Sequence, residues 1–239
     1  MGKHFRIGVL GGMGPEAGVL MQLLIIRETP AERDQDHIEV IAYTNPHVPD
    51  RTESLASDGG ESYLTEVKDS LGLLERAGVD VLVMACNTAH ARLAEIRESV
   101  KTPMLDMVGF ARKEMEATKG VVGILATDGT LRSGLFRIPE HPEKTMEPRG
   151  EEQREIMALI HDIKKGVKGG SIVERLVRVC VGLRGAGSAK LVLGCTELSI
   201  YHDELRERLG DVLIDPMRLA ARALVRMAKQ KTPSRGCGR

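Results

Sequence analysis

Aromatic side chains and surplus charge are scarce in this chain. Its 239 residues include no tryptophan, three phenylalanines and three tyrosines, which leaves few rings on which nucleic-acid bases could stack. Lysine and arginine together number 34, as do aspartate and glutamate, so the formal net charge is zero at pH 7. Without an excess of positive charge, neither a nucleic acid nor an anionic membrane surface is an expected partner.

Long apolar runs are also missing. No stretch of the sequence reaches the length of about 18 apolar residues that a membrane-spanning helix needs. The amino terminus leads directly into the short apolar stretch Ile7–Leu10, without the pattern of a cleaved signal peptide. These absences predict a soluble protein of the cytoplasm.

Cysteine is rare as well. The chain has four cysteines, Cys86, Cys180, Cys195 and Cys237, and their wide spacing excludes a disulfide framework and a paired CxxC zinc ribbon. We therefore expect free thiols in a reducing compartment. Cys180 lies in the apolar stretch Ile172–Leu183 and is typical of a buried packing residue, whereas Cys237 belongs to the expected C-terminal tail, Lys229–Arg239.

What the sequence does contain is a regular alternation of apolar, β-branched runs with amphipathic stretches. This alternation predicts an α/β fold with parallel sheets. The expected strands are Phe5–Leu10, Ile38–Thr44, Val79–Ala85, Met104–Asp106, Val121–Ala126, Lys190–Gly194 and Val212–Asp215. The expected helices are Glu16–Glu28, Ser62–Ala77, Ala89–Val100, Arg154–Lys165 and Ile172–Leu183, and Glu140–Gln153 is expected to be a solvated loop.

The pattern of local signals occurs twice, at an offset of about 110 residues. Val122–Ala126 repeats Ile7–Gly11, and a cysteine follows the third expected strand of each half. The repeat predicts two similar Rossmann-like domains with parallel sheets, related by a pseudo-two-fold duplication, with the active site in the cleft between them. We expect residues 1–108 plus 215–239 to form the first domain and residues 109–214 the second. Parallel-sheet proteins in general share Val- and Leu-rich strands, but this alternative does not explain the shared cysteine.

Cys86 and Cys195 are the two cysteines in question, each placed between an expected strand and an expected helix start. The partial positive charge of a helix start favours the thiolate and lowers the pKa of a thiol. Two such groups on opposite sides of a cleft suit an inversion at carbon, in which one removes a proton and the other delivers a proton to the opposite face. That reaction requires no metal and no organic cofactor.

The sequence around these cysteines resembles a known family. Met84–His90 and Leu193–Leu198 resemble the two cysteine motifs of the aspartate/glutamate racemase superfamily. Three further stretches resemble its aspartate racemase branch, and they are Gly11–Ala17, Asn45–Thr52 and Ile160–Gly166. The resemblance spans roughly residues 5–227 and implies a cofactor-independent aspartate racemase that forms a homodimer.

The resemblance also implies a role for individual residues. Cys86 and Cys195 would exchange the proton, and Arg51 would hold a substrate carboxylate, because a guanidinium can bind both oxygens of a carboxylate. Lys164 would supply a second cation, with the adjacent Lys165 as the alternative. The remaining implied substrate-binding residues are Met13, Asn87, Thr88, Ala89, Thr127 and Thr196.

Other substrates and another class of function stay open at this point. The same cleft could serve glutamate or a broad range of amino acids, and a non-catalytic protein could close on a dicarboxylate without inverting it. Two cysteines argue against one-cysteine decarboxylases or isomerases, and Arg51 argues against hydantoins, which lack a second carboxylate. The three threonines Thr88, Thr127 and Thr196 could instead cap their helices.

Cofactor and metal sites are not expected. Gly12-x-Gly14-x-x-Ala17 fits a dinucleotide fingerprint, but no acidic residue follows the next strand to hold a ribose. No context for pyridoxal phosphate stands out around Lys164. His90 could ligate zinc, but no second Cys/His pair has suitable spacing, so we expect His90 to orient Cys86 instead.

Overall fold

Two parallel β-sheets form the framework of the protein in a computed structural model that describes residues 4–231. The first sheet has the order β2-β1-β3. Its central strand, β1 (Arg6–Gly11), pairs with β2 (Glu39–Thr44) on one side and β3 (Val81–Met84) on the other. Because β1 and β3 are buried on both faces, they carry continuous apolar runs rather than an alternating pattern.

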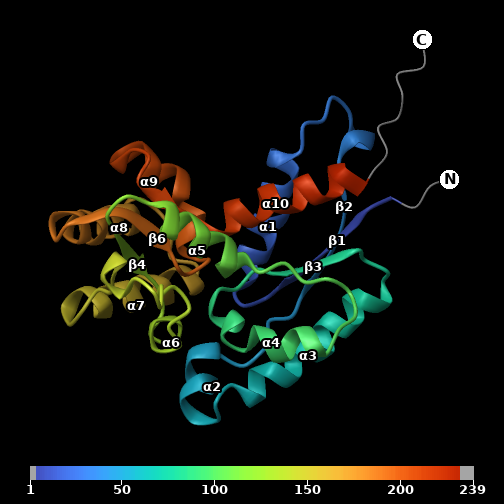
Figure 1. Ribbon diagram of the computed structural model, residues 1–239, viewed down its shortest axis with the longest axis horizontal. Coiled ribbons are helices and arrows are strands. Elements are labelled where there is room, and N and C mark those ends of the chain that lie inside the picture. Colours follow the sequence, from blue (N-terminus) through green and yellow to red (C-terminus); the bar gives the residue numbers. More distant parts are fainter. Residues whose placement is uncertain (1–3, 232–239) are drawn as a thin grey trace.

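Helices cover both faces of this first sheet (Figure 1). Ile7 and Val9 pack against α1 (Pro15–Glu28) and α10 (Pro216–Lys231), whereas Leu10 and Leu82 pack on the opposite side with α3 (Glu61–Arg76). The shorter helices of this half are η1 (Asp34–Asp36), α2 (Arg51–Ser57), η2 (Thr88–Arg92) and α4 (Leu93–Glu98).

The second sheet has the order β5-β4-β6-β7 and is also parallel. Its strands are β4 (Val121–Leu125), β5 (Thr145–Met146), β6 (Ser188–Leu193) and β7 (Leu213–Ile214). The helices around it are α5 (Met107–Ala117), α6 (Asp128–Arg132), η3 (Pro142–Lys144), α7 (Glu151–Lys164), α8 (Gly170–Gly185), η4 (Leu198–Tyr201) and α9 (His202–Leu209). Two apolar clusters cover its two faces, as in the first sheet.

The two sheets share one topology. In each, the first strand of the half is central and lies between the second and third strands of that half. This confirms the predicted α/β fold with two similar parallel sheets. The carboxyl ends of β1 and β3, and of β4 and β6, are the points where the strand order reverses, and open α/β sheets bind ligands there.

The C-terminal helix returns to the first half. Met217 and Leu224 of α10 lie in the core beside β1, and Figure 1 places α10 next to α1. By contrast, Val108 and Met115 of α5 belong to the core of the second sheet. The chain therefore passes between the halves twice, and the predicted domain boundaries stay a prediction.

Two predicted elements differ from those observed. The expected strand Met104–Asp106 is a single bridge between Met104 and Leu82, because the side chain of Asp106 turns to cap α5 by accepting a hydrogen bond from the Gly109 backbone N–H at 2.7 Å. The expected helix Ala89–Val100 is divided into η2 and α4. At Arg92 the backbone leaves the helical region, with φ −114° and ψ 28°.

The ends of other predicted segments also move. The expected loop Glu140–Gln153 contains η3, β5 and the start of α7. The expected tail overlaps α10, which continues to Lys231, and Cys237 lies outside the described residues. Cys180 is buried as predicted, and burial raises the pKa of its thiol to about 12.

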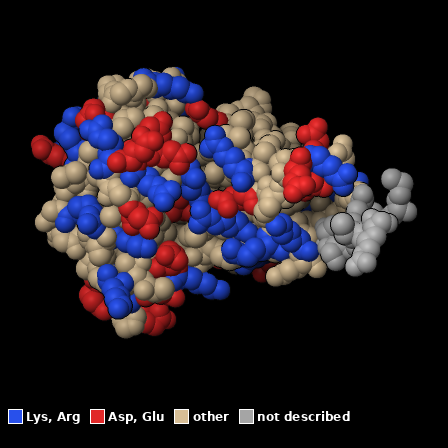
Figure 2. Space-filling model, turned by 90° about the horizontal axis from the view of Figure 1, so that it is seen from above, with Lys and Arg blue, Asp and Glu red and all other residues tan. Residues whose placement is uncertain are grey.

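The outer surface shows positive and negative side chains interspersed over the face drawn in Figure 2. Within residues 4–231, no helix has both the length and the apolar character needed to cross a membrane.

Candidate active site

One pocket lies between the two halves, where the carboxyl ends of the strands meet. Four of its residues, Met13, Cys86, Thr127 and Cys195, each stand two positions beyond the end of β1, β3, β4 and β6. The full lining is Met13, Asp50, Arg51, Thr52, Cys86, Asn87, Thr88, Thr127, Lys164, Cys195, Thr196 and Glu197. The cavity that these residues enclose is about 10 Å³, roughly the space that one water molecule needs, so the pocket is nearly closed.

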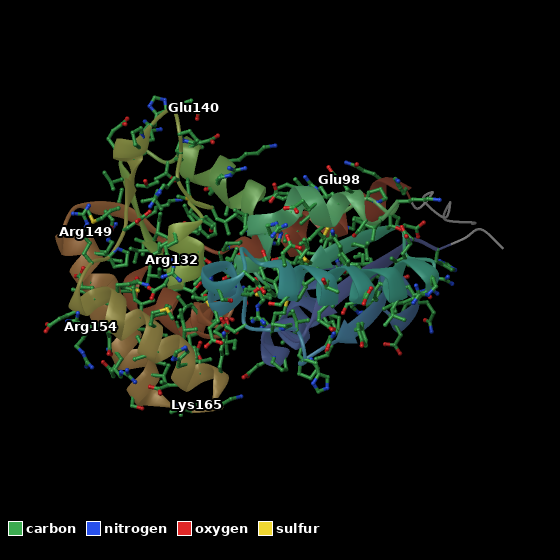
Figure 3. The ribbon with its side chains drawn as sticks, turned by 90° about the horizontal axis from the view of Figure 1, so that it is seen from below. Glu98, Arg132, Glu140, Arg149, Arg154 and Lys165 are labelled. Atoms are coloured by element: carbon green, nitrogen blue, oxygen red, sulfur yellow. The ribbon has the colours of Figure 1, made fainter. Side chains whose placement is uncertain are left out.

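Nearly all residues that the sequence pointed to meet in this pocket. Ala89 is the exception, because it is fully buried in the core behind β3 and does not line the pocket. Lys164 lines the pocket, whereas Lys165 lies at the periphery of the molecule, as labelled in Figure 3.

Three lining residues escaped the sequence reasoning. Asp50 and Thr52 flank Arg51 at the start of α2, and Glu197 follows Cys195 by two positions. A signal for Asp50 was present, because Asp50 and Glu53 have the spacing of a helix-capping pair. Glu197 stood inside a motif already noted but had no assigned role.

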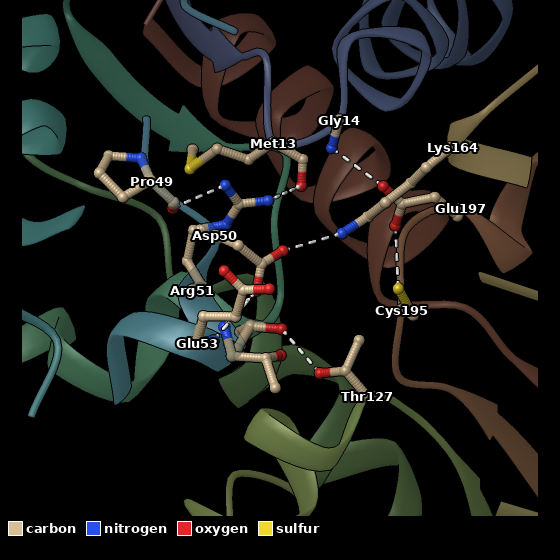
Figure 4. A network of polar contacts seen from close by, with 12 residues as sticks. Met13, Gly14, Pro49, Asp50, Arg51, Glu53, Thr127, Lys164, Cys195 and Glu197 are labelled. Carbon is tan, nitrogen blue, oxygen red and sulfur yellow. Dashed lines mark hydrogen bonds and ion pairs between the residues drawn. The ribbon is translucent and has the colours of Figure 1, made fainter. Parts of the chain in front are cut away.

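Cys195 donates a hydrogen bond from its thiol to Glu197 Oε2 at 2.9 Å (Figure 4). Burial, together with the negative charge of Glu197, raises the pKa of Cys195 well above its usual value, although Lys164 opposes this effect. Cys195 is therefore a protonated thiol in this structure.

This corrects the expectation that a helix start would lower the pKa of Cys195. Only the short 3-10 helix η4 follows the cysteine, and it begins three residues later at Leu198. A helix of one turn provides a small dipole, and the adjacent carboxylate outweighs it. Cys86 likewise precedes the short 3-10 helix η2 rather than a long helix.

Glu197 also joins the two halves of the molecule. Its Oε1 accepts a hydrogen bond from the Gly14 backbone N–H at 3.0 Å (Figure 4). The glycine-rich turn that resembled a dinucleotide fingerprint therefore presents an amide to a carboxylate of the protein. Gly12 is required there for packing, because it has φ +102° and a Cβ would lie 2.2 Å from the Asn45 carbonyl oxygen.

Arg51 is held firmly in the wall of the pocket. Its Nη1 donates to the carbonyls of Val48 and Pro49, and its Nη2 donates to the carbonyl of Met13, each at 3.0 Å (Figure 4). These three bonds fix the plane of the guanidinium group. One Nη2–H and the Nε–H have no hydrogen-bond partner among the described residues. The remaining N–H groups can bind a carboxylate.

Asp50 and Lys164 form an ion pair across the pocket at 3.4 Å (Figure 4). Burial raises the pKa of Asp50, but the charge of Lys164 and the backbone N–H of Glu53 together lower it below its usual value. Burial lowers the pKa of Lys164, and the charges of Glu197, Cys195 and Asp50 together raise it. Both members of the pair are therefore charged at neutral pH.

Behind Cys86, the buried His90 holds the backbone. Its Nδ1 donates to the Cys86 carbonyl at 2.8 Å, so His90 supports the cysteine through the main chain rather than through its sulfur. Burial lowers the pKa of His90, although the charge of Asp106 opposes it. Asn87 reaches across to the other half, where its Nδ2 donates to the Leu193 carbonyl at 3.4 Å. Within residues 4–231, no three His, Cys, Asp or Glu side chains are grouped as metal ligands.

Two of the candidate threonines are not simple helix caps. Thr127 does cap α6 by accepting a hydrogen bond from the Thr130 backbone N–H at 3.2 Å. Thr196 instead donates its hydroxyl proton to the Ala85 carbonyl at 3.4 Å, and Thr88 bonds to the hydroxyls of Thr127 and Thr130. The site therefore brings together two thiols, two cations, two carboxylates and several hydroxyls.

Comparison with known proteins adds a family to this geometry. Residues 10–224 match the model of the Asp/Glu/Hydantoin racemase family. Among solved structures, the chain is similar to the Picrophilus torridus aspartate racemase, with a TM-score of 0.82, 29% identity and 94% of each chain covered.

Most of the similar curated proteins are named glutamate racemases, and one, from Bacillus subtilis, is named a broad specificity amino-acid racemase. The chain is 35% identical to the enzyme of Deinococcus radiodurans over 62% of this chain and 53% of the relative. It is 31% identical to that of Pseudomonas paraeruginosa over 86% of this chain and 77% of the relative. The chain spans about half the length of several of the curated relatives that it matches.

Proposed function

Because the chain belongs to the Asp/Glu/Hydantoin racemase family, we propose that it is a cofactor-independent amino-acid racemase that acts on aspartate. The observation that carries this proposal is the presence of Cys86 and Cys195 on one pocket, each from an equivalent position of a different half. Two thiols in this arrangement supply one base and one acid to the same carbon atom.

The inversion step balances when one cysteine is a thiolate and the other is a thiol. The thiolate of one cysteine takes the proton from Cα, and the thiol of the other gives its proton to the opposite face of Cα. The cysteines thereby exchange protonation states, and reversal of direction exchanges their roles. When Cys195 acts as the base, Glu197 Oε2 is placed to accept its thiol proton, since the two groups share a hydrogen bond of 2.9 Å.

The charges of the pocket favour a dicarboxylic amino acid. Arg51 and, once its ion pair with Asp50 opens, Lys164 supply two cations for two carboxylates. Asp50 and Glu197 supply negative charge for an ammonium group. Donors aimed at the α-carboxylate stabilise the charge that develops there as the proton leaves Cα.

Glutamate is the alternative substrate, and it has a specific observation in its favour, because most of the similar curated proteins are named glutamate racemases. Support for aspartate comes from the similarity to the Picrophilus torridus aspartate racemase over nearly the whole of both chains. A protein that binds a dicarboxylate without inverting it remains a third outcome of the same experiment.

A panel of amino acids tests the proposal. Each pure D- and L-isomer of aspartate, glutamate, alanine and serine would be incubated with the purified protein, without added cofactor and with a chelator. We expect inversion of aspartate with a kcat/KM at least tenfold above that for glutamate. Inversion of glutamate in preference to aspartate would select the alternative, and binding without inversion would refute the racemase proposal.

The assembly is part of the proposal. The family resemblance implies a homodimer, and helix α1 offers a surface for it. This helix is apolar on both sides, since Met21 and Leu24 face the core while Val19, Leu23 and Ile26 remain 59%, 38% and 50% exposed. A helix with apolar side chains on every face is expected to be buried on every face. We therefore expect another protein surface to cover the exposed side of α1.

The charges of α1 favour a second copy as the cover. Glu16 lies in its first turn and Arg27 in its last. Antiparallel packing of two α1 helices about a two-fold axis would place Glu16 beside the partner's Arg27, twice, with the apolar residues between. Within one chain, Glu16 pairs with Lys168 and Arg27 pairs with Asp203. These ion pairs are exposed, so replacing them by pairs between two copies costs little free energy.

The proposed chemistry favours a reducing cellular compartment. Cys86, Cys180 and Cys195 are all free thiols, and the proposed reaction requires the two pocket thiols to stay reduced. We therefore place the proposed activity in the cytoplasm, where disulfides are rare.

A further inference from the structure

Three threonine hydroxyls form a closed ring beside the pocket. Thr88 Oγ1 lies 3.2 Å from Thr127 Oγ1 and 2.8 Å from Thr130 Oγ1, and the last two atoms are 3.1 Å apart. All three side chains are buried, with exposed fractions of 6%, 5% and 1% in that order. Thr88 comes from the first half, whereas Thr127 is the N-cap residue of α6 and Thr130 lies within this helix of the second half, so the ring joins the halves.

Only two members of the ring face the pocket. Thr88 and Thr127 line it, whereas Thr130 does not. The position of Thr130 is fixed from behind by packing. A Cβ on the neighbouring Gly129 would lie 2.9 Å from the Thr52 Cα, so α6 and α2 approach as closely as their backbones allow.

The hydrogen bonds of the ring must rearrange when a carboxylate enters the pocket. Each hydroxyl has one proton, and a closed ring of three hydroxyls uses all three protons internally. A carboxylate only accepts hydrogen bonds, so Thr88 and Thr127 must turn their protons out of the ring to bind it. Thr130 can then donate its proton to the hydroxyl oxygen of Thr88 or of Thr127. The rearrangement therefore leaves no buried proton without an acceptor.

We propose that Thr130 is a positioning residue: its one hydroxyl proton goes to Thr88 or Thr127 and holds that hydroxyl so that it donates, beside its neighbour, to one substrate carboxylate. A hydroxyl that accepts a hydrogen bond from Thr130 is itself a stronger donor, because bonds in a chain polarise one another. The inference rests on the proposed function, since it assigns this ring to the carboxylate of an amino-acid substrate. The ring serves the transition state when that carboxylate is the one next to Cα, where charge grows as the proton leaves.

Thr130→Val tests the role, because valine keeps the branched shape and removes the hydroxyl. We expect kcat/KM for aspartate to fall by about 10- to 50-fold, with a decrease in kcat as well as an increase in KM. Thr130→Ser keeps the hydroxyl and is expected to remain within about threefold of the wild type. Thr118→Val is the matched control, since Thr118 is also buried and donates at 2.8 Å to the Glu114 carbonyl, away from the pocket.

The outcomes distinguish a positioning role of Thr130 from a purely structural role of this residue. They also separate failure of this proposal from failure of the proposed racemase function. The proposal is overturned if Thr130→Val keeps kcat/KM within twofold of the wild type, or if Thr130→Ser loses more than tenfold. The second condition applies even when the valine variant does not fold. Calorimetric binding of L-aspartate to the wild type and the variants provides a second readout. A wild type without racemase activity refutes the proposed function, and the affinity of Thr130→Val for aspartate still tests the ring.

Discussion

At the scale of single residues, Glu197 distinguishes the two thiols of the pocket. It accepts the proton of Cys195 at 2.9 Å and the backbone N–H of Gly14 at 3.0 Å, so its carboxylate is fixed at both oxygens. A second carboxylate, Asp50, faces it across the pocket and is neutralised by Lys164. Each acidic group of the site therefore has a definite partner, and only Cys195 of the two cysteines is hydrogen-bonded to a carboxylate.

Replacement of Glu197 by glutamine is expected to lower the pKa of Cys195. Burial remains in the variant, but the negative charge that also raises this pKa is removed. The thiolate of Cys195 therefore forms at lower pH in Glu197→Gln than in the wild type. Thiolate absorbance measured during a pH titration checks this, with Glu197→Gln/Cys195→Ser as the control that isolates the signal of Cys195. A titration at the same or higher pH would contradict the assigned contact.

Asp50→Asn separates charge from capping. The Oδ1 of Asp50 accepts hydrogen bonds from the backbone N–H groups of Thr52 and Glu53 at 2.9 and 3.1 Å, and asparagine caps a helix as well as aspartate does. The pKa of Asp50 is lowered in the folded state, so its negative charge stabilises the fold at any pH above the ordinary carboxyl pKa. This contribution to the free energy of unfolding is lost as the pH falls through the lowered pKa.

We therefore expect the Tm of Asp50→Asn to be about 1–4 °C below that of the wild type at pH 7. The difference should shrink as the pH falls below the ordinary carboxyl pKa of about 3.9 and disappear below the lowered pKa of Asp50. Thermal melts of both proteins across this pH range provide the measurement. A difference that persists unchanged in acid would mean that the stabilisation does not come from the ion pair with Lys164.

The sequence predicts the identity of most pocket residues but not their partners. Arg51 and Lys164 were found through motifs, yet the three carbonyls that hold Arg51 are backbone atoms, which no residue pattern reveals. The pKa of Cys195 was expected to fall and instead rises, because a side chain two positions away outweighs the dipole of a short helix. Local sequence indicates where a group lies, whereas its charge state depends on what the fold brings beside it.

At the scale of elements, helix α1 is the one whose two faces require an explanation. Leu23→Glu would place a charge at the centre of the exposed apolar stripe Val19, Leu23 and Ile26. We expect this variant to be monomeric at a concentration where the wild type is dimeric, as measured by light scattering after gel filtration. The matched control is Leu73→Glu on α3, where a leucine is 45% exposed on a more polar face. A dimer disrupted by Leu73→Glu and not by Leu23→Glu would contradict the assigned surface.

Long and strongly periodic elements were predicted well, and short ones were not. The expected helix Glu16–Glu28 and the expected strand Val121–Ala126 agree with α1 and β4 to within a residue at each end. Met104–Asp106 carried an apolar strand pattern, but a capping aspartate and a preceding proline limit its pairing to one bridge. Such competition between a strand and the next helix is decided by side-chain hydrogen bonds rather than by apolar pattern.

At the scale of the whole molecule, contacts between the halves surround the pocket. They include the ion pairs of Lys164 with Asp50 and of Lys168 with Glu16, and the hydrogen bond from Gly14 to Glu197. A ligand held between the halves binds the folded state and not the unfolded chain. At a concentration of 100 times the Kd, it stabilises by about 2.7 kcal/mol.

We therefore expect L-aspartate at that concentration to raise the Tm by about 5–11 °C. Differential scanning calorimetry with and without aspartate measures the shift, and L-alanine, which lacks the second carboxylate, serves as the control ligand. An equal shift with alanine would contradict the requirement for two carboxylates, and no shift with aspartate would contradict the site.

The sequence repeat was enough to predict two similar sheets, but not how they meet. Asn87 and Leu193 are 106 residues apart and touch across the interface of the two halves, and no local pattern encodes such a contact. Residues at the carboxyl ends of equivalent strands could be expected to share a cleft. The ring of Thr88, Thr127 and Thr130 could not, because it depends on how closely α6 approaches α2.

The most direct test of the two-thiol reaction uses Cys86→Ser and Cys195→Ser, each incubated with D- and L-aspartate in deuterated water. Inversion and α-deuteration would be followed together, with Cys180→Ala as the control, because Cys180 is buried away from the pocket. We expect each serine variant to lose about 10²- to 10⁴-fold in inversion and to deuterate at most one enantiomer, while the control stays active. Full racemase activity in either serine variant would contradict the two-thiol mechanism.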